Sequence, residues 1–485
     1  MNLRHILLGA GLVLLAANAA EARSAKRGVC AKFTFASEIE LLEPGVCWWY
    51  NWGNTPGAGY KGEVAAYEGD FEFIPMCWNA SYSADNIREY CKAHPEVKYL
   101  LGFNEPNFTN QANMTPEAAA ARWPEVQALA KELGLQLVAP ALNYSPNPPY
   151  QDPLRWMDEF VALVGKDAFD FTAIHNYGGF GVMQTLGTQF HERYGKPVWV
   201  TEWCNWPGGA GDVFVAPATQ ISSMVECLEW LEQTPWIHRY SWFMAQGPHD
   251  TANKPNYGLL INNRGDVSLS DQGKVYVNLW DFDPEYRHPV GERICAADYH
   301  ARTYAMVGAC AAPDAPKSIE ISSFSGGATL DYQFDIPESG DYMLELTVSG
   351  IGEPSRFNPC ISIVSVNADG TDGTVLSAAR RFALPGADDS YTTESFAVSL
   401  PAGPQTIRLK DEAPYQPSGI RISALRITSA AGIDGILAGS DTANSPVDVY
   451  NASGIRIRSA VKASDATAGL PSGLYIAGGK KVFVK

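Results

Sequence analysis

Two short runs decide how this chain folds: Gly102-Phe103-Asn104-Glu105-Pro106-Asn107 and Trp199-Val200-Thr201-Glu202-Trp203. Each is a stretch of apolar, β-prone residues that ends abruptly in a carboxylate and is followed by a turn and a helical pattern. In a (β/α)8 barrel, the polar residues at the ends of the strands gather at one rim. The two runs therefore predict that Glu105 and Glu202 lie together at the C-terminal rim of an α/β TIM barrel.

The alternation of strand and helix extends from about residue 28 to residue 262. Short, nearly continuous apolar runs are typical of parallel strands that are buried on both faces. Such a pattern fits a barrel or a doubly wound sheet, but no GxGxxG turn follows the first strands to indicate a dinucleotide fold. If the first run is not a strand, the carboxylates follow the third and sixth strands instead of the fourth and seventh. The eight runs are 28–35, 46–52, 71–78, 99–103, 135–142, 169–176, 197–202 and 237–243.

The charge and aromatic content of the chain indicate which kind of polymer it can bind. The 485 residues are enough for two or three domains, and the formal charge of −17 repels a polyanion such as nucleic acid. A neutral polysaccharide is not repelled. The 13 Trp and 22 Tyr exceed what a core needs and leave aromatic rings for a cleft that stacks sugars.

The N-terminus indicates export. Residues 1–22 combine basic Arg4 and His5, an apolar run over 6–15 and a small-x-small cleavage site at Ala20-Glu21-Ala22. We expect a signal peptide and a secreted or cell-surface protein, with no transmembrane segment because no other apolar stretch is long enough. We also expect a monomer.

Cysteine usage gives little further information. Nine Cys in an exported chain permit disulfides but leave one thiol over, and Cys295 with Cys310 is a possible pair. No CxxC or His-rich spacing indicates zinc, so we expect no metal at the site and no required cofactor.

Composition changes near residue 283 and again near residue 432. After 283, turns rich in Asp, Pro and Gly separate short alternating strands, which indicates an all-β sandwich. The last 54 residues or so alternate strand and turn and are too short to bury a large core. The predicted domains are a barrel over 26–282, a sandwich over 283–430 and a small β domain over 432–485.

A pair of carboxylates at one rim suits the cleavage of a glycosidic bond. One carboxylic acid must protonate the leaving oxygen, and one carboxylate must attack or stabilise the anomeric carbon. We assign Glu105 as the acid and later the base, and Glu202 as the nucleophile. Asn104 is placed to hold the sugar 2-hydroxyl. A rim salt bridge or helix cap is the alternative reading of either Glu.

Other residues at strand ends are candidates for substrate binding. His175 and Tyr177 end the strand before Glu202, and either could orient that carboxylate or bind the sugar, although a strand-end His is often structural. Alternation allows only about half of the Trp-rich run 48–52 to face a cleft, and any one ring alone fits a core position better. The full set of predicted substrate-binding residues is Asn104, His175, Tyr177, Trp49, Tyr50, Trp78, Asn143, Trp203 and Trp242.

These motifs resemble glycoside hydrolase family 128, the Asl1-like glycosyl hydrolases. The resemblance covers residues 26–262 and includes Lys26-Arg27-Gly28, 102–107, Val138-Ala139-Pro140-Ala141, 174–178, 196–203 and Tyr240-Ser241-Trp242-Phe243. It implies a retaining endo-β-1,3-glucanase with Glu105 as acid/base and Glu202 as nucleophile. The substrate, a β-1,3-glucan such as laminarin, is implied by the resemblance alone. The cysteine-containing starts of the first two strands depart from the family pattern and leave the first strand's register open.

The remaining parts carry weaker resemblances. Residues 294–428 are similar to a family 6 carbohydrate-binding module, a jelly roll, through Ala296-Ala297-Asp298-Tyr299, 331–342 and 400–409. That resemblance implies a structural calcium ion with no assignable ligands, and a spacer without sugar binding is the alternative. The tail resembles the C-terminal sorting domain of type IX secretion substrates through 450–454, 470–476 and 480–485, and a cell-wall-binding β module is the alternative.

Three functions follow as hypotheses. The first is a secreted or cell-surface hydrolase of β-1,3-glucan. The second is a barrel glycosidase for another β-glycan, such as a mannan or galactan. The third is a surface glycan-binding protein with an inactive barrel, which the presence of both carboxylates disfavours.

Overall fold

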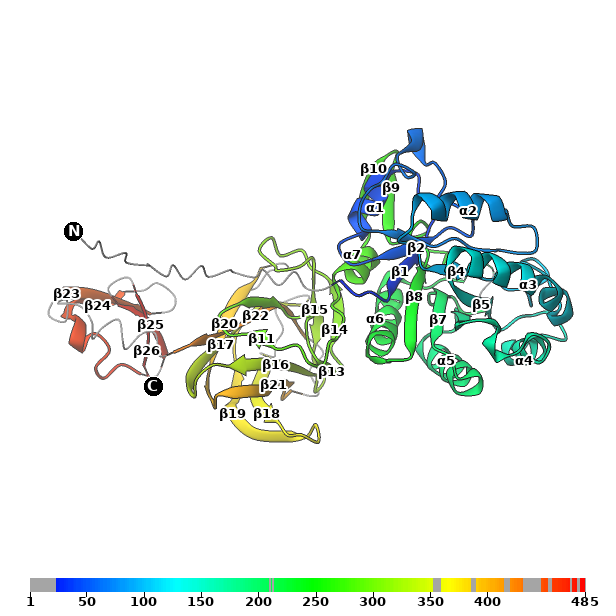
Figure 1. The fold of residues 1–485 in the computed structure, drawn as a ribbon. Helices are drawn as coiled ribbons and strands as arrows, with labels where there is room; N and C mark the ends of the chain where they lie inside the picture. The colour runs from blue at the N-terminus through cyan, green and yellow to red at the C-terminus, as the bar shows by residue number, and fades with distance from the viewer. Residues whose placement is uncertain are drawn as a thin grey trace, which may run out of the picture.

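The computed structural model shows an α/β domain followed by two β-sheet domains (Figure 1). It describes residues 23–208, 211, 213–351, 359–384, 390–413, 419–430, 446–451, 456–471, 473–477 and 480–484. The predicted signal peptide lies outside these residues, as do Ala452-Ser453-Gly454 of the predicted sorting domain. No helix of the described part is long and apolar enough to cross a membrane.

Eight parallel strands form one curled sheet in the order β3-β2-β1-β8-β7-β6-β5-β4. A parallel bridge between Met76 and Leu101 joins the two ends of the sheet, and the Cys77 N–H donates to the Leu101 carbonyl over 2.8 Å. All eight predicted strands are present, so Glu105 follows the fourth strand and Glu202 lies on the seventh. The strands are β1 Arg27–Cys30, β2 Trp48–Tyr50, β3 Glu72–Phe73, β4 Tyr99–Leu101, β5 Gln136–Leu142, β6 Phe171–Asn176, β7 Val198–Trp203 and β8 Ile237–Phe243.

Helices cover the outside of the sheet (Figure 1). Local sequence fixes their ends: Thr115 accepts a hydrogen bond from the Ala118 N–H to begin α3, and Gly134 ends it in the left-handed conformation that glycine tolerates. Between β2 and β3 the only helical element is a single 3-10 turn, η1 (Tyr60–Gly62). The α-helices are α1 Ala36–Leu42, α2 Ala84–Ala93, α3 Pro116–Leu133, α4 Pro153–Val164, α5 Phe180–Tyr194, α6 Pro217–Gln233 and α7 Asp271–Asn278, with a hairpin of β9 Leu260–Asn263 and β10 Asp266–Leu269 before α7.

The strands are buried on both faces. Side chains on the inner face form one hydrophobic cluster inside the barrel, and side chains on the outer face belong to a second hydrophobic cluster with the helices. Trp48, Tyr50 and Trp199 point into the barrel, where they pack with one another and fill the interior beneath the rim. Trp49 and Val200, one residue away, point outward to the helices. This alternation determines which strand-end side chains can reach the rim.

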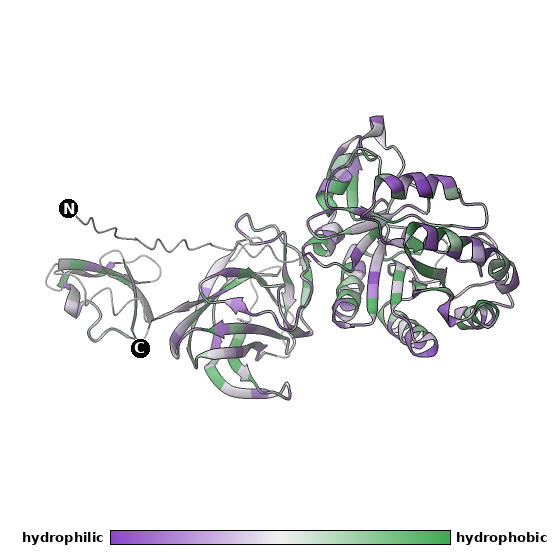
Figure 2. Ribbon diagram, in the orientation of Figure 1, coloured by the Kyte–Doolittle hydropathy of each residue, from purple (hydrophilic) through white to green (hydrophobic). Residues whose placement is uncertain are grey.

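Residues 288–429 form two six-stranded sheets, one with β11-β16-β21-β18-β19 and β13, the other with β14-β15-β22-β17-β20 and β12. Buried Tyr332 of one sheet and Leu344 of the other belong to one hydrophobic cluster, and Figure 2 shows the alternation of hydrophobic and hydrophilic residues along these strands. The strands are β11 His288–Pro289, β12 Arg293–Cys295, β13 Ala301–Thr303, β14 Met306–Ala309, β15 Ile319–Phe324, β16 Thr329–Ile336, β17 Gly340–Gly350, β18 Cys360–Val366, β19 Asp372–Arg381, β20 Thr392–Leu400, β21 Gly403–Asp411 and β22 Ile420–Ser429.

This pair of sheets packs against the barrel at α6 and α7. Arg302 forms an ion pair with Glu229 of α6 at 2.6 Å, and the Tyr299 hydroxyl donates to the same carboxylate. Glu229 lies near the C-terminal end of α6, which runs opposite to the strands, so the contact lies toward the end of the barrel away from the carboxylate rim. The two sheets therefore leave that rim uncovered.

A four-stranded sheet forms the C-terminal part, in the order β24-β23-β25-β26. Its strands are β23 Pro446–Asn451, β24 Arg456–Lys462, β25 Gly473–Ala477 and β26 Lys480–Val484. All nine cysteines of the chain are described and are free thiols. The possible disulfide between Cys295 and Cys310 is therefore not formed: the Cys295 thiol is buried against the Ile319 carbonyl, while the Cys310 thiol faces Glu320.

Candidate active site

Glu105 stands at the rim because the chain leaves β4 in an unusual backbone conformation. Asn104 pairs with Ala141 of the β5 strand, and the Glu105 N–H then donates to the Ala141 carbonyl over 2.9 Å. Glu105 has φ +43°, a left-handed value that costs free energy for a residue with a side chain. Glu105 is 6% exposed. Such strain persists where surrounding contacts enforce it, and it frequently marks a functional site.

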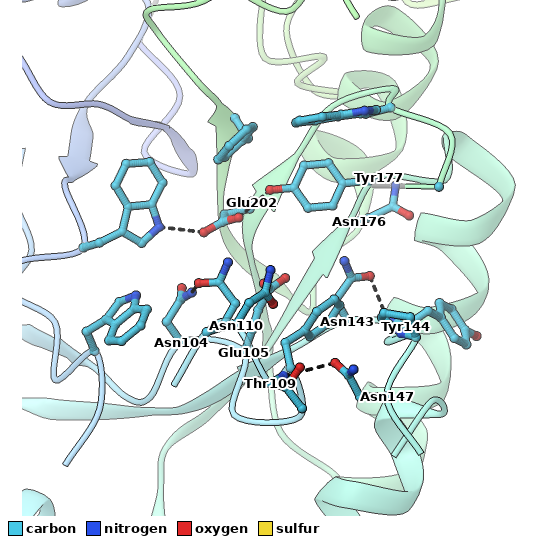
Figure 3. Close-up of a pocket in the computed structure, with 18 of the residues that line it drawn as sticks. Asn104, Glu105, Thr109, Asn110, Asn143, Tyr144, Asn147, Asn176, Tyr177 and Glu202 are labelled. Atoms are coloured by element: carbon cyan, nitrogen blue, oxygen red, sulfur yellow. Dashed lines mark hydrogen bonds between the residues drawn. The ribbon is translucent and has the colours of Figure 1, made fainter. Parts of the chain in front are cut away.

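His175 of β6 lies between the two carboxylates. Its Nδ1 is 2.9 Å from Oε1 of Glu105 and 3.3 Å from Oε2 of Glu202. One ligand atom from each of the three side chains lies within 4.8 Å of the others. The predicted meeting of Glu105 and Glu202 across one narrow gap is therefore present, and Figure 3 shows both at the base of a cleft.

Glu202 is held by donors from two further strands. The Tyr177 hydroxyl, just beyond β6, donates to its Oε2, and Figure 3 shows this ring pointing at the carboxylate. Trp52, just beyond β2, donates its indole N–H to Oε1 over 2.7 Å, and the Tyr50 hydroxyl lies 3.1 Å from the same atom. Three donors fix the orientation of this carboxylate and favour its ionised form.

Burial and charge oppose each other at this cluster. Burial, and then the nearby Glu105, raise the pKa of Glu202, against the lowering effects of His175, Tyr177 and Trp52. Burial alone would lower the pKa of His175, but Glu202 and Glu105 outweigh it and raise that pKa above its ordinary value. Both shifts favour the protonated forms of Glu202 and His175, and a proton held among such groups is what acid–base catalysis uses.

The cleft above the carboxylates has a volume of about 1350 Å³. One group of lining side chains is aromatic and the other carries amides, which together offer flat apolar surfaces and hydrogen-bonding groups for sugar rings. The aromatic group comprises Trp52, Trp78, Phe108, Tyr144, Tyr177, Trp206 and Phe243, and the amide group comprises Asn51, Asn104, Asn110, Gln111, Asn143, Asn147 and Asn176.

Of the predicted substrate-binding residues, four line this cleft: Asn104, Trp78, Asn143 and Tyr177. Tyr50 and His175 lie beneath it, fully buried, and reach the carboxylates rather than the open space. Their position fits orientation of the carboxylates, which was one of the two predicted roles for His175.

Three predicted substrate-binding residues are wrongly placed by the sequence analysis. Trp49, Trp203 and Trp242 are 2%, 1% and 0% exposed and belong to the outer hydrophobic layer. Each is a neighbour of an inward-facing residue, and the two-residue period of a strand turns it to the helices instead. Trp203 packs edge to face on Trp242, with ring centroids 4.6 Å apart.

Several lining residues were not among the predicted substrate-binding residues. Trp52 belongs to the run 48–52, of which about half was expected to face a cleft. It has φ +62° and lies on the inner face with Trp48 and Tyr50, where it reaches Glu202. Lys32 places its ammonium 5.7 Å from the Trp52 ring centroid. Asn110, Gln111 and the other loop residues follow no periodic pattern that sequence analysis could use.

Glu105, His175 and Glu202 are also, within the described ranges, the one group of such side chains close enough to hold a metal ion. The donors from Tyr177, Trp52 and Tyr50 already occupy lone pairs of Glu202, which favours proton sharing over metal ligation here. No comparable group of three such side chains lies in the described part of 288–429, and the calcium ion that the jelly-roll resemblance implied stays a prediction.

Several solved structures are similar to part of this chain. Among solved structures, a family 128 subgroup II endo-β-1,3-glucanase from Pseudomonas viridiflava is 32% identical, with 53% of this chain and 98% of that chain covered and a TM-score of 0.45. The corresponding Sorangium cellulosum enzyme is 29% identical over 52% and 98%, with a TM-score of 0.44. A subgroup I enzyme from Amycolatopsis mediterranei, in complex with laminaritriose, is 28% identical over 46% and 90%, with a TM-score of 0.38.

No curated protein matches the chain. The family model described as the glycosyl hydrolase catalytic core matches residues 30–276, which is half of the 485 residues and includes both carboxylates. By this match the chain belongs to the glycosyl hydrolase catalytic core family, and the protein is a glycoside hydrolase.

Proposed function

We propose that the protein cleaves β-1,3-glucan within the chain and retains the anomeric configuration. The observation that carries the mechanism is the spacing of the carboxyl groups, whose nearest ligand atoms lie within 4.8 Å of each other. Retaining enzymes hold their carboxyl groups about 5 Å apart, whereas inverting enzymes leave roughly 6.5–9.5 Å for a water molecule. The short spacing supports double displacement.

In the first step, an Oε atom of Glu202 attacks the anomeric carbon and the bond to the leaving oxygen breaks. Glu105 donates its proton to that oxygen, so the departing glucan leaves as an alcohol. The product of this step is a glycosyl ester on Glu202. Trp52 and Tyr177 hold the attacking carboxylate by their hydrogen bonds.

In the second step, Glu105, now ionised, takes a proton from a water molecule. The resulting hydroxide character on the water oxygen lets it attack the same anomeric carbon, and the ester bond to Glu202 breaks. Glu105 ends the cycle protonated and Glu202 ends it ionised. His175 contacts both carboxyl groups and therefore stays beside the ionised one in each step.

The substrate class rests on the family 128 motifs and on the character of the cleft. A volume of about 1350 Å³ exceeds the roughly 300–1,000 Å³ of a small-molecule site and suits several sugar units. Apart from the two carboxylates, Lys32 is the one charged side chain among the described lining residues, which suits a neutral polysaccharide.

The test is a polysaccharide panel that contains laminarin, a β-1,4-mannan and a β-1,4-galactan, with reducing ends and product sizes measured. We expect laminarin to be cut into a range of oligosaccharides. Glu105→Gln and Glu202→Gln should lose this activity while they retain laminarin binding. Cleavage of only the mannan or galactan would overturn the substrate assignment, and binding without any cleavage would favour the glycan-binding alternative.

We further propose that the protein acts outside the cell, with the two sheets over 288–429 as a carbohydrate-binding module. The basis is the signal-like N-terminus and the family 6 resemblance. Affinity electrophoresis of residues 283–430 in laminarin gels, with and without calcium, tests the module. Unretarded migration in both gels would identify it as a spacer.

A further inference from the structure

The loop after β5 presents an exposed aromatic ring inside the cleft. Tyr144 is 47% exposed and lines the same cleft as Glu105 and Glu202. In the view of Figure 3, Asn143 lies between Glu105 and Tyr144, and the Tyr144 ring lies at the outer side of the drawn residues. A sugar face can stack on an exposed aromatic ring, because the contact buries apolar surface of both.

This loop is fixed to the loop that carries Glu105. Asn107, 5% exposed, donates its amide N–H groups to the carbonyls of Asn143 and Tyr150, over 2.8 Å and 3.2 Å. The Ser145 hydroxyl donates in return to the Asn107 carbonyl over 2.9 Å. Tyr144 is therefore flanked on both sides by residues bonded to Asn107.

A second connection joins the same two loops farther out. The Thr109 N–H donates to Oδ1 of Asn147 over 3.1 Å, as Figure 3 shows. The Tyr144 N–H donates to Oδ1 of Asn143 over 2.8 Å and fixes the local turn. These bonds hold the Tyr144 backbone beside the loop that carries Glu105 without using the Tyr144 side chain, which leaves the ring face and the hydroxyl for a ligand.

We propose that Tyr144 is a distal sugar platform that determines the length of glucan chain the enzyme prefers. This inference rests on the proposed function. Short oligosaccharides fill the space next to the carboxylates and do not reach the ring, whereas longer chains stack a sugar unit on it. Binding energy gained there is available to the chemical step only for substrates long enough to reach it.

The test is a length series of β-1,3-linked gluco-oligosaccharides, from the trisaccharide to the hexasaccharide, with kcat/KM measured for each. Tyr144→Ala should lower kcat/KM for the hexasaccharide about tenfold, the equivalent of one good stacking contact, and change it less than about twofold for the shortest substrate cleaved. Tyr144→Phe should retain the preference because the ring remains.

Tyr60 provides a matched control, since it is 48% exposed and lies outside the cleft lining. Tyr60→Ala should change no rate in the series, and the melting temperatures of all variants should equal that of the parent. An equal loss at every length, or no loss at any, would overturn the platform. If the parent protein cleaves only β-1,4-linked oligosaccharides, the proposed function fails, and the same comparison in that series still decides the role of Tyr144.

Discussion

The imidazole Nδ1 of His175 lies 2.9 Å from Oε1 of Glu105, with both groups almost completely buried. The same nitrogen is 3.3 Å from Glu202. A single ring thus contacts both carboxyl groups of the proposed reaction, and proton transfer at one carboxyl group changes the charge that the other experiences. The catalytic pair is better described as a coupled group of three.

Coupling and burial lead to a stability prediction for Glu202→Gln. Burial raises the pKa of Glu202 above 4.5, so the folded protein binds this proton more tightly than the unfolded chain. Protonated Glu202 therefore stabilises the folded protein. This contribution to the free energy of unfolding is fully present below the pKa that Glu202 has in the unfolded chain, and it is lost as the pH rises through the higher pKa of Glu202 in the folded protein. His175, whose pKa is also raised, contributes with the same sign.

The Gln variant removes the cost of the buried charge, so it should be inactive but more stable than the parent at neutral pH. Each kcal/mol gained in the free energy of unfolding should raise the melting temperature by roughly 2–4 °C. Thermal melts from about pH 4 to about pH 8 should show the difference between the two proteins growing with pH. A difference that shrinks toward neutral pH would contradict the assigned direction of the shift.

Tyr177→Phe should reduce kcat with little change in KM. The variant loses one hydrogen bond to a charged group, worth about 1.5–3 kcal/mol, which corresponds to roughly a tenfold to hundredfold loss. Tyr67 makes a similar hydroxyl–carboxylate contact with Glu43 away from the cleft, so Tyr67→Phe is the control and should leave kcat unchanged. Equal effects of the two substitutions would indicate a general structural role.

Lys32→Met should lower kcat/KM severalfold and move the acidic limb of the pH–rate profile to higher pH. The Lys32 ammonium lies over the Trp52 ring, and the Trp52 indole donates to Glu202. Loss of this positive charge makes Glu202 harder to ionise. The effect should weaken at high salt because Lys32 is exposed.

Lys61→Met is the matched control, because Lys61 lies 4.9 Å from the Tyr60 ring outside the cleft. It should change neither rate nor profile, and Lys32→Arg should restore the parent profile. An unchanged acidic limb in Lys32→Met would show that Lys32 has no influence on the nucleophile.

Trp78 and Trp203 should respond to truncation in opposite ways. Trp78 lines the cleft, so Trp78→Ala should raise KM for oligosaccharides and change the melting temperature little. Trp203 is buried on the outer face, so Trp203→Ala should cost about 3–5 kcal/mol of stability. Chemical denaturation and oligosaccharide kinetics on both variants distinguish substrate binding by Trp78 from core packing by Trp203. A Trp203→Ala variant with parental stability and a raised KM would contradict the position of Trp203 in the outer hydrophobic layer.

Sequence reasoning predicted all eight strands and the meeting of Glu105 and Glu202, because buried parallel strands and the residues that end them follow simple rules. It misplaced Trp203 and Trp242, although alternation from Glu202 and from neighbouring inward residues already turns them outward. Trp52 was left out of the predicted substrate-binding residues, although alternation from Trp48 and Tyr50 already places it on the inner face. No periodic pattern of the sequence indicates the roles of Lys32 and Asn107. Their contacts at the site are with Trp52 and Asn143, which lie 20 or more residues away in the sequence.

The central claim is that Glu105 and Glu202 act on one anomeric carbon by double displacement. Proton NMR of the reaction, recorded before mutarotation, tests it most directly with a reduced-end β-1,3-gluco-oligosaccharide as substrate. We predict that the newly formed reducing ends carry the β configuration first and that the α anomer grows in later. Products that first carry the α configuration would contradict the claim, because they would require direct attack by water.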